Sequence, residues 1–209
     1  MRSIILDNNR LNFFFFFLFF PSLYQLYKFP AMKHLSYPSA VVFDLDYTLW
    51  PFWCDTHITL PLKVISYNKL VDRYGFRISL YKDVESVFSE LESNNVVIIG
   101  ASRTAAPHIA REILSLIYIG EKPMIKYFHS LQWGQGSKIR HIKKAAEQLG
   151  LEEELHKGKF ILFDDEYRNK DVTSINCEFV HVSEEFGLTR EYFEKGVHIW
   201  SKTKDPKKK

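Results

Sequence analysis

The chain has 209 residues, of which 46% are hydrophobic and 25% charged, so its composition excludes a disordered or collagen-like protein and its length suits one globular domain with short extensions. The formal net charge of +3 comes from the ends, because the first 35 residues and the last eight carry a basic excess while the stretch between them is acidic. An acidic body does not favour a nucleic-acid partner, and we predict the Lys-rich tail, residues 202–209, to be a solvated end.

Residues 1–31 form an apolar, Phe-rich leader. Positions 11–20 are apolar except for Asn12, include five consecutive Phe, and are followed by Pro21. The run is shorter than the about 20 residues that a membrane-spanning helix needs, and no small-residue cleavage site of a secretory signal follows it. We predict that the functional protein starts at Met32 and does not contact a membrane. An organelle or membrane anchor is the alternative.

The body of the chain alternates short apolar runs with helical patterns. Continuous apolar, β-branched character predicts strands at residues 40–45, 96–100, 159–163 and 178–182. Apolar residues at three- and four-residue steps predict helices at residues 62–74, 84–93, 106–118 and 137–149. This alternation indicates an α/β domain over residues 36–201 with a mainly parallel sheet flanked by helices. No Gly-rich phosphate loop is present, which excludes nucleotide binding by that route.

Cys54 and Cys177 are the two cysteines. They are too few for a disulfide framework, and they lack the spacing of a zinc site. A reducing compartment is the simpler interpretation. We therefore predict a cytoplasmic protein, and we expect it to be a monomer.

Polar residues collect where the predicted strands end, which is where parallel sheets bind ligands. Asp44 and Asp46 are two residues apart, so on an extended chain we expect their carboxylates to leave one face and converge on one cation. A neighbouring strand end adds Asp164 and Asp165. Carboxylate oxygens together with waters are the ligands that Mg²⁺ prefers. The sequence therefore predicts a magnesium site built from Asp44, Asp46, Asp164 and Asp165.

A second group of residues has the chemistry to bind phosphate. Lys138 stands at the start of a predicted helix, and Ser102 and Arg103 follow the second strand. Their ammonium, hydroxyl and amide donors suit the non-bridging oxygens of a phosphoryl group. Each feature also has a structural alternative: a solvated Asp-x-Asp loop, a helix cap at Ser102, a surface lysine, or an Asp-Asp turn. The joint occurrence of all four features, in order, favours a phosphoryl-transfer site.

These motifs resemble those of the haloacid dehalogenase superfamily, and of its magnesium-dependent phosphatase 1 branch in particular. The resemblance rests on VFDLDYTLWPFW at residues 42–53 and the following Asp55-Thr56-His57, supported by ASRT at 101–104 and FDDE at 163–166. It covers residues 36 to 200. It implies a Rossmann-like fold, and the short intervals between the motifs leave no room for a separate cap domain.

The resemblance also implies a role for each motif residue. Asp44 would be the nucleophile that forms an aspartyl-phosphate, and Asp46 the general acid and base. Mg²⁺ would be held by Asp44, the backbone carbonyl of Asp46 and a carboxylate of the Asp164-Asp165 pair, of which we favour Asp164. The residues expected to hold the phosphoryl group are Thr48, Ser102, Arg103 and Lys138.

An uncapped site is open, so it admits phosphotyrosine in a protein as well as phosphorylated small molecules. Trp50, Phe52 and Trp53 are expected beside the mouth, where they either stack on an aromatic substrate or pack the flap. The resemblance implies activity on phosphotyrosine and on sugar phosphates, including glycated-amine sugars. Alternatives are a dedicated fructosamine-phosphate phosphatase, a receiver-like signalling module, in which Asp46 has no role, and a non-catalytic binding module.

Overall fold

The computed structural model describes residues 36–204. The predicted leader, residues 1–31, and the end of the Lys-rich tail, residues 205–209, lie outside the described residues. The central sheet has five strands in the order β10–β9–β1–β5–β8, and every neighbouring pair is parallel. The strands are β1 (Ala40–Phe43), β5 (Val97–Ser102), β8 (Ser130–Trp133), β9 (Phe160–Asp164) and β10 (Cys177–His181).

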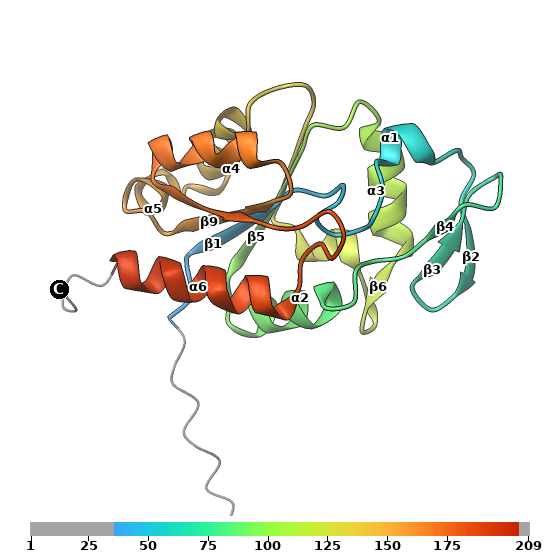
Figure 1. The fold of residues 1–209 in the computed structure, drawn as a ribbon, viewed down its shortest axis with the longest axis horizontal. Helices are drawn as coiled ribbons and strands as arrows, with labels where there is room; N and C mark the ends of the chain where they lie inside the picture. The colour runs from blue at the N-terminus through green and yellow to red at the C-terminus, as the bar shows by residue number, and fades with distance from the viewer. Residues whose placement is uncertain (1–35, 205–209) are drawn as a thin grey trace, which may run out of the picture. The chain divides into compact units, whose positions relative to one another are not determined.

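Helices cover both faces of this sheet. One face carries α2 (Val84–Ser93), α3 (Pro107–Leu116) and α6 (Arg190–Lys204), and the other carries α4 (Lys138–Leu149) and α5 (Glu152–His156). In Figure 1, α4 and α5 lie on one side of β1 and β9, and α6 and α2 lie on the other. The prediction of a mainly parallel sheet flanked by helices is confirmed.

Strand β1 shows why the sheet is buried on both faces. Val41 and Phe43 belong to the apolar cluster under α2, α3 and α6, and Ala40 and Val42 belong to the cluster under α4. All four side chains are fully buried. Because successive side chains of a strand point to opposite faces, only a continuous apolar run satisfies both clusters.

Helix α4 starts and stops where its sequence signals predict. The Ser137 hydroxyl accepts a hydrogen bond from the backbone N–H of Arg140, as an N-cap does, and Gly150 ends the helix in the left-handed region at φ 66°. The cap fixes the first turn of α4 and therefore the position of Lys138 within that turn. Helix α2 also agrees with its predicted bounds, whereas the predicted helix 106–118 gives way at its end to the short strand β6 (Tyr118–Ile119).

The predicted helix 62–74 is wrong. Residues 63–78, hereafter the flap, form a small antiparallel sheet of β2 (Lys63–Ser66), β3 (Lys69–Val71) and β4 (Arg77–Ile78). Asn68 at φ 54° turns the chain between β2 and β3, and Gly75 at φ 91° lies in the turn before β4. Asn and Gly adopt this left-handed conformation most readily, so the segment forms turns where a helix would need continuous right-handed backbone.

Strand β8 lies outside the predicted strands, because only its alternate residues, Leu131 and Trp133, are apolar. Ser130 and Gln132 face α4, where both side chains hydrogen-bond Gln148 at 3.0 and 2.6 Å. This polar contact takes the place that apolar packing holds elsewhere in the sheet. The remaining short elements are α1 (Cys54–His57), β7 (Lys122–Pro123), η1 (Met124–Tyr127) and η2 (Tyr167–Ile175). Among residues 36–204, none of the helices combines the length and the apolar character needed to cross a bilayer.

The buried carboxylate of Asp72 holds the flap together. It accepts hydrogen bonds from the backbone N–H groups of Thr59, Tyr74 and Phe76 at 3.0, 2.8 and 2.8 Å. Burial favours its neutral form, but these donors outweigh burial and lower its pKa. A carboxylate with a lowered pKa stabilises the fold above its unfolded pKa of about 3.9 and loses that contribution in acid.

We therefore expect Asp72→Ala to loosen the flap by about 2 kcal/mol, because three N–H groups lose a charged acceptor. Hydrogen–deuterium exchange of peptides covering residues 59–78 should be about 30-fold faster at neutral pH. Asp171→Ala, at an exposed position, is the matched control and should leave these peptides unchanged. Equal exchange in both variants would show that Asp72 does not hold the flap.

Candidate active site

The adjacent strands β1, β5 and β9 bring the predicted site residues to one edge of the sheet. Asp44 directly follows β1, Ser102 ends β5 and Asp164 ends β9. The backbone N–H of Asp44 donates to Phe163 at 3.0 Å, which continues the β1–β9 pairing to the start of the site. The expectation that separate strand ends gather these side chains agrees with the structure.

Lys138 reaches this edge from the first turn of α4. It is 1% exposed, forms an ion pair with Asp44, and lies 3.1 Å from a carboxylate oxygen of Asp164. Burial lowers the pKa of Lys138, but the charges of Asp44 and Asp164 outweigh that effect, so the pKa is raised and the ammonium stays charged. The surface-lysine alternative is therefore excluded.

Three carboxylates form a compact acidic cluster. Asp44, Asp164 and Asp165 each place one oxygen within 4.8 Å of the others. Burial raises the pKa of Asp44 well above its usual range, although the charge of Lys138 acts in the opposite direction. Burial, together with the smaller effect of the Asp164 charge, raises the pKa of Asp165 to about 7. Such a cluster of hard oxygen donors at high charge density fits a divalent cation such as Mg²⁺.

Asp164 and Asp165 have different surroundings. Asp164 is fully buried and accepts hydrogen bonds from the backbone N–H of Glu166 at 2.8 Å and from Asn169 Nδ2 at 2.9 Å. Asp165 lines the cavity described below, whereas Asp164 does not. Asp165 is therefore the member of the pair that faces the cavity. Asn169 was not predicted, since no sequence motif marks a residue that acts only by orienting a carboxylate.

The carboxylate of Asp46 is not part of the acidic cluster. Its Oδ1 accepts hydrogen bonds from Trp50 Nε1 at 2.7 Å and from the backbone N–H of Cys54 at 3.1 Å. An extended chain predicts that the Asp44 and Asp46 carboxylates converge on one cation, but β1 ends at Phe43 and the Asp46 carboxylate turns instead to these two donors of its own loop. Burial raises the pKa of Asp46.

A polar cavity of about 340 Å³ opens above the cluster. Among the predicted phosphate-binding residues, Ser102, Arg103 and Lys138 line it. Arg103 is held by a hydrogen bond from its Nε to the backbone carbonyl of Gly136 at 2.7 Å. The remaining lining residues are Asp44, Asp46, Trp53, Asp55, Thr56, Thr104, Gln135, Asp165, Glu166 and Arg168, of which Gln135 and Arg168 were not singled out from the sequence.

Thr48 lies outside the cavity, next to Asp165. It is fully buried, is not among the cavity-lining residues, and places its hydroxyl 3.5 Å from an Asp165 carboxylate oxygen. Its backbone carbonyl accepts a hydrogen bond from the N–H of Leu188. Thr48 therefore lies behind Asp165, where its hydroxyl is placed to orient this carboxylate.

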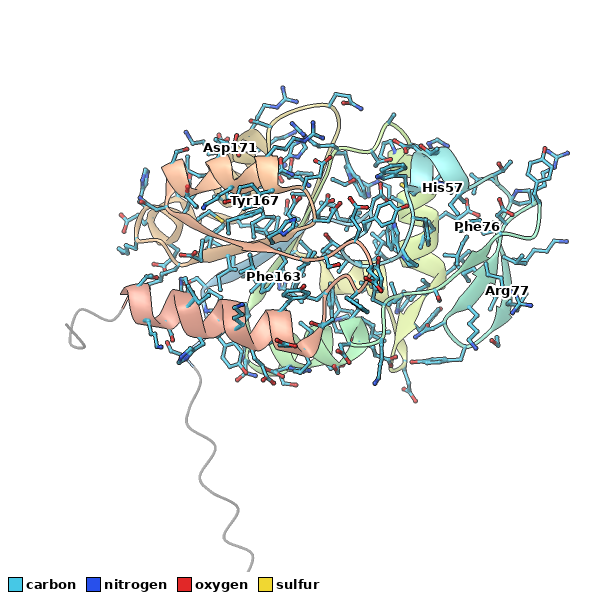
Figure 2. All side chains as sticks on the ribbon, viewed as in Figure 1. His57, Phe76, Arg77, Phe163, Tyr167 and Asp171 are labelled. Atoms are coloured by element: carbon cyan, nitrogen blue, oxygen red, sulfur yellow. The ribbon has the colours of Figure 1, made fainter. Side chains whose placement is uncertain are left out.

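The aromatic residues divide between packing and exposure. Trp50 and Phe52 are buried and stack on each other with ring centroids 5.7 Å apart, so they pack the loop. Trp53 lines the cavity and is 49% exposed. Its indole stacks on His57, which in turn stacks on Phe76 of the flap. Figure 2 labels His57 and Phe76, which lie on the side of the molecule that carries α1 and β4.

Comparison with known proteins shows the family to which the chain belongs. The family model described as acid phosphatase matches residues 36–203. A Saccharomyces cerevisiae protein named for a magnesium-dependent phosphatase is 39% identical over 156 residues, which are 70% of this chain and 88% of that protein. Human magnesium-dependent phosphatase 1 is 34% identical over 166 residues, which are 79% of this chain and 88% of the human protein.

Solved structures give the same fold at low sequence identity. A haloacid dehalogenase superfamily hydrolase from Ehrlichia chaffeensis is 12% identical with a TM-score of 0.52, over 81% of this chain and 98% of that one. A phosphatase domain from Bacteroides fragilis, solved in complex with Mg, is 14% identical with a TM-score of 0.50, over 76% of this chain and 39% of that one. The chain belongs to the acid phosphatase family, in the magnesium-dependent phosphatase 1 branch of the haloacid dehalogenase superfamily.

Proposed function

We propose that this chain is a Mg²⁺-dependent phosphatase that hydrolyses phosphate monoesters through an aspartyl-phosphate on Asp44. The observation that carries the proposal is the contact of Asp44 with Lys138 inside a cluster whose carboxylate oxygens lie within 4.8 Å of one another. The charge of Lys138 opposes the effect of burial and so favours the charged, nucleophilic form of Asp44. The family and the names of the relatives support the same reaction class.

In the first step, a carboxylate oxygen of Asp44 attacks phosphorus while the bond from phosphorus to the leaving oxygen breaks. Asp46 gives its proton to that oxygen, so an alcohol departs and an aspartyl-phosphate remains. In the second step, Asp46 takes a proton from water, the water oxygen attacks phosphorus, and inorganic phosphate leaves. Asp44 returns as a carboxylate and Asp46 as an acid, so the site is ready for another substrate.

The other residues hold and neutralise the phosphoryl group. Ser102, Arg103 and Lys138 supply donors to its non-bridging oxygens. Mg²⁺ would be held by Asp44, Asp165 and the backbone carbonyl of Asp46. Bound there, it supplies the positive charge that lets an anionic carboxylate approach an anionic phosphate. Asp164 then serves to hold Lys138.

The walls of the cavity support a proposal for the substrate class. Exposed Trp53 offers an aromatic face for phosphotyrosine, whereas Asp55, Thr56 and Gln135 offer polar groups to a sugar phosphate. We propose activity on both classes; a dedicated fructosamine-phosphate phosphatase is the alternative. A non-catalytic binding module would not need Asp46 as a general acid, so the position of Asp46 at the cavity favours the enzyme over this alternative. The cytoplasmic location, the monomeric state and the lack of nucleic-acid contact remain predictions from composition.

Asp44→Asn should abolish turnover, because an amide cannot form the acyl phosphate. We expect residues 32–209 to hydrolyse p-nitrophenyl phosphate with Mg²⁺ and to show no hydrolysis with a chelator. The turnover rate of Asp44→Asn should be lower by at least about 10³-fold. Asp171→Asn is the matched control and should keep full activity. Undiminished turnover by Asp44→Asn would rule out Asp44 as the nucleophile.

Metal-free protein should lose stability as the pH rises. The pKa of Asp165 is raised to about 7 in the folded protein, whereas an Asp in the unfolded chain has a pKa of about 3.9. Between these two pH values the unfolded chain ionises Asp165 more readily than the folded protein does, so the folded protein loses stability. The stabilisation by Mg²⁺ should therefore be larger at pH 8 than at pH 5.5, by several degrees in melting temperature. Asp165→Asn should reduce this difference. An equal Mg²⁺ effect at both pH values in the wild type would contradict the raised pKa.

Trp53→Ala should separate the two substrate classes. Loss of the stacking face should raise KM for a phosphotyrosine peptide about 5- to 10-fold and leave KM for a sugar phosphate nearly unchanged. Trp53→Phe, which keeps an aromatic face, should restore most of the affinity. If both substrates lose affinity equally, Trp53 only packs against His57 and the flap.

A further inference from the structure

The candidate general acid, Asp46, is held by its own loop. Its Oδ1 accepts two hydrogen bonds, from Trp50 Nε1 at 2.7 Å and from the Cys54 N–H at 3.1 Å. Asp46 and Trp50 also form a backbone bridge, which closes the loop on itself. Asp46 is 8% exposed and Trp50 is fully buried, so water competes little for these bonds.

The donor on Trp50 is fixed by packing. Its indole stacks on Phe52 with an interplanar angle of 10°, and the Phe52 N–H donates to the Trp50 carbonyl at 3.1 Å. A buried, stacked indole has few rotamers available, so its N–H keeps one direction. The bond therefore restrains the carboxylate more than an exposed donor would.

The second carboxylate oxygen meets a different neighbour. The Cys54 thiol donates a weak hydrogen bond to Asp46 Oδ2 at 3.7 Å, and its sulfur lies 3.2 Å from the Thr104 hydroxyl. The Thr104 N–H donates to the Ser102 hydroxyl at 3.1 Å. Asp46 is thus linked through Cys54 and Thr104 to Ser102, a residue proposed to hold the phosphoryl group.

We propose that Trp50 and Cys54 are positioning residues that fix which oxygen of Asp46 carries the catalytic proton; this inference rests on the proposed phosphatase function. Two N–H donors on Oδ1 make that oxygen an acceptor only, so the exchangeable proton resides on Oδ2. An indole N–H donates to a carboxylate and, more weakly, to the carbonyl oxygen of a carboxylic acid, so the bond persists in both protonation states. Asp46 can therefore give and regain its proton without reorienting between the two steps.

This role is tested by the dependence of rate on the leaving group. Phenyl phosphate releases a far more basic phenolate than p-nitrophenyl phosphate, so its cleavage needs proton donation more. The value of kcat/KM reports the steps through departure of this group. Trp50→Phe should lower kcat/KM for phenyl phosphate about 10-fold more than for p-nitrophenyl phosphate. The matched control is Phe52→Leu, which disturbs the same buried stack but keeps the Trp50 donor, and it should lower both values equally.

A second pair of variants keeps the test open if Trp50→Phe does not fold. Cys54→Ala removes the sulfur between Asp46 and Thr104, and it should shift the ratio of the two esters in the same direction, about 2- to 3-fold. Cys54→Ser restores a donor and should restore the ratio. If Trp50→Phe leaves the ratio of kcat/KM for the two esters unchanged, the positioning role is overturned. Where Trp50→Phe does not fold, an unchanged ratio in Cys54→Ala has the same meaning. Failure of the wild type to hydrolyse either ester with Mg²⁺ would instead overturn the proposed function.

Discussion

The ion pair between Lys138 and Asp44 lies almost entirely out of water, next to two further carboxylates. Breaking such a pair by removing one partner leaves an uncompensated buried charge, which is costly. Three carboxylates against one ammonium still leave the cluster with an excess of negative charge. Burial, reinforced by this excess charge, raises the pKa values of Asp44 and Asp165, and the excess explains the affinity for a divalent cation that we propose.

The fold supplies this arrangement with few parts. Neighbouring parallel strands deliver Asp44, Ser102 and Asp164 to one edge of the sheet, and a capped helix start delivers Lys138 from the facing layer. Supporting residues then orient the charged groups: Asn169 holds Asp164, and Trp50 holds Asp46. The chemistry thus depends on side chains whose directions are set by packing of the loops and of η2 behind the site.

Much of this could be predicted from the sequence, and the failures have physical reasons. Asp44 and Lys138 were found because an apolar run that ends in a carboxylate and a Ser-capped helix start are local signals. The sequence predicts a helix at residues 62–74 because its apolar spacing is compatible with the helical period as well as the strand period, whereas the turn at Asn68 and the contacts of Asp72 produce strands there. The Trp50–Asp46 bond depends on how the loop closes in three dimensions, which spacing alone does not encode.

The central claim, covalent catalysis by Asp44, is tested most directly by trapping the intermediate. Asp46→Asn lacks the base for the second step but still forms the intermediate from p-nitrophenyl phosphate, whose leaving group needs little proton donation. After an acid quench, peptide mapping by mass spectrometry should find one phosphoryl group on Asp44, removable by hydroxylamine. A burst of p-nitrophenol with Asp44 unmodified, or with phosphate on another residue, would contradict the account.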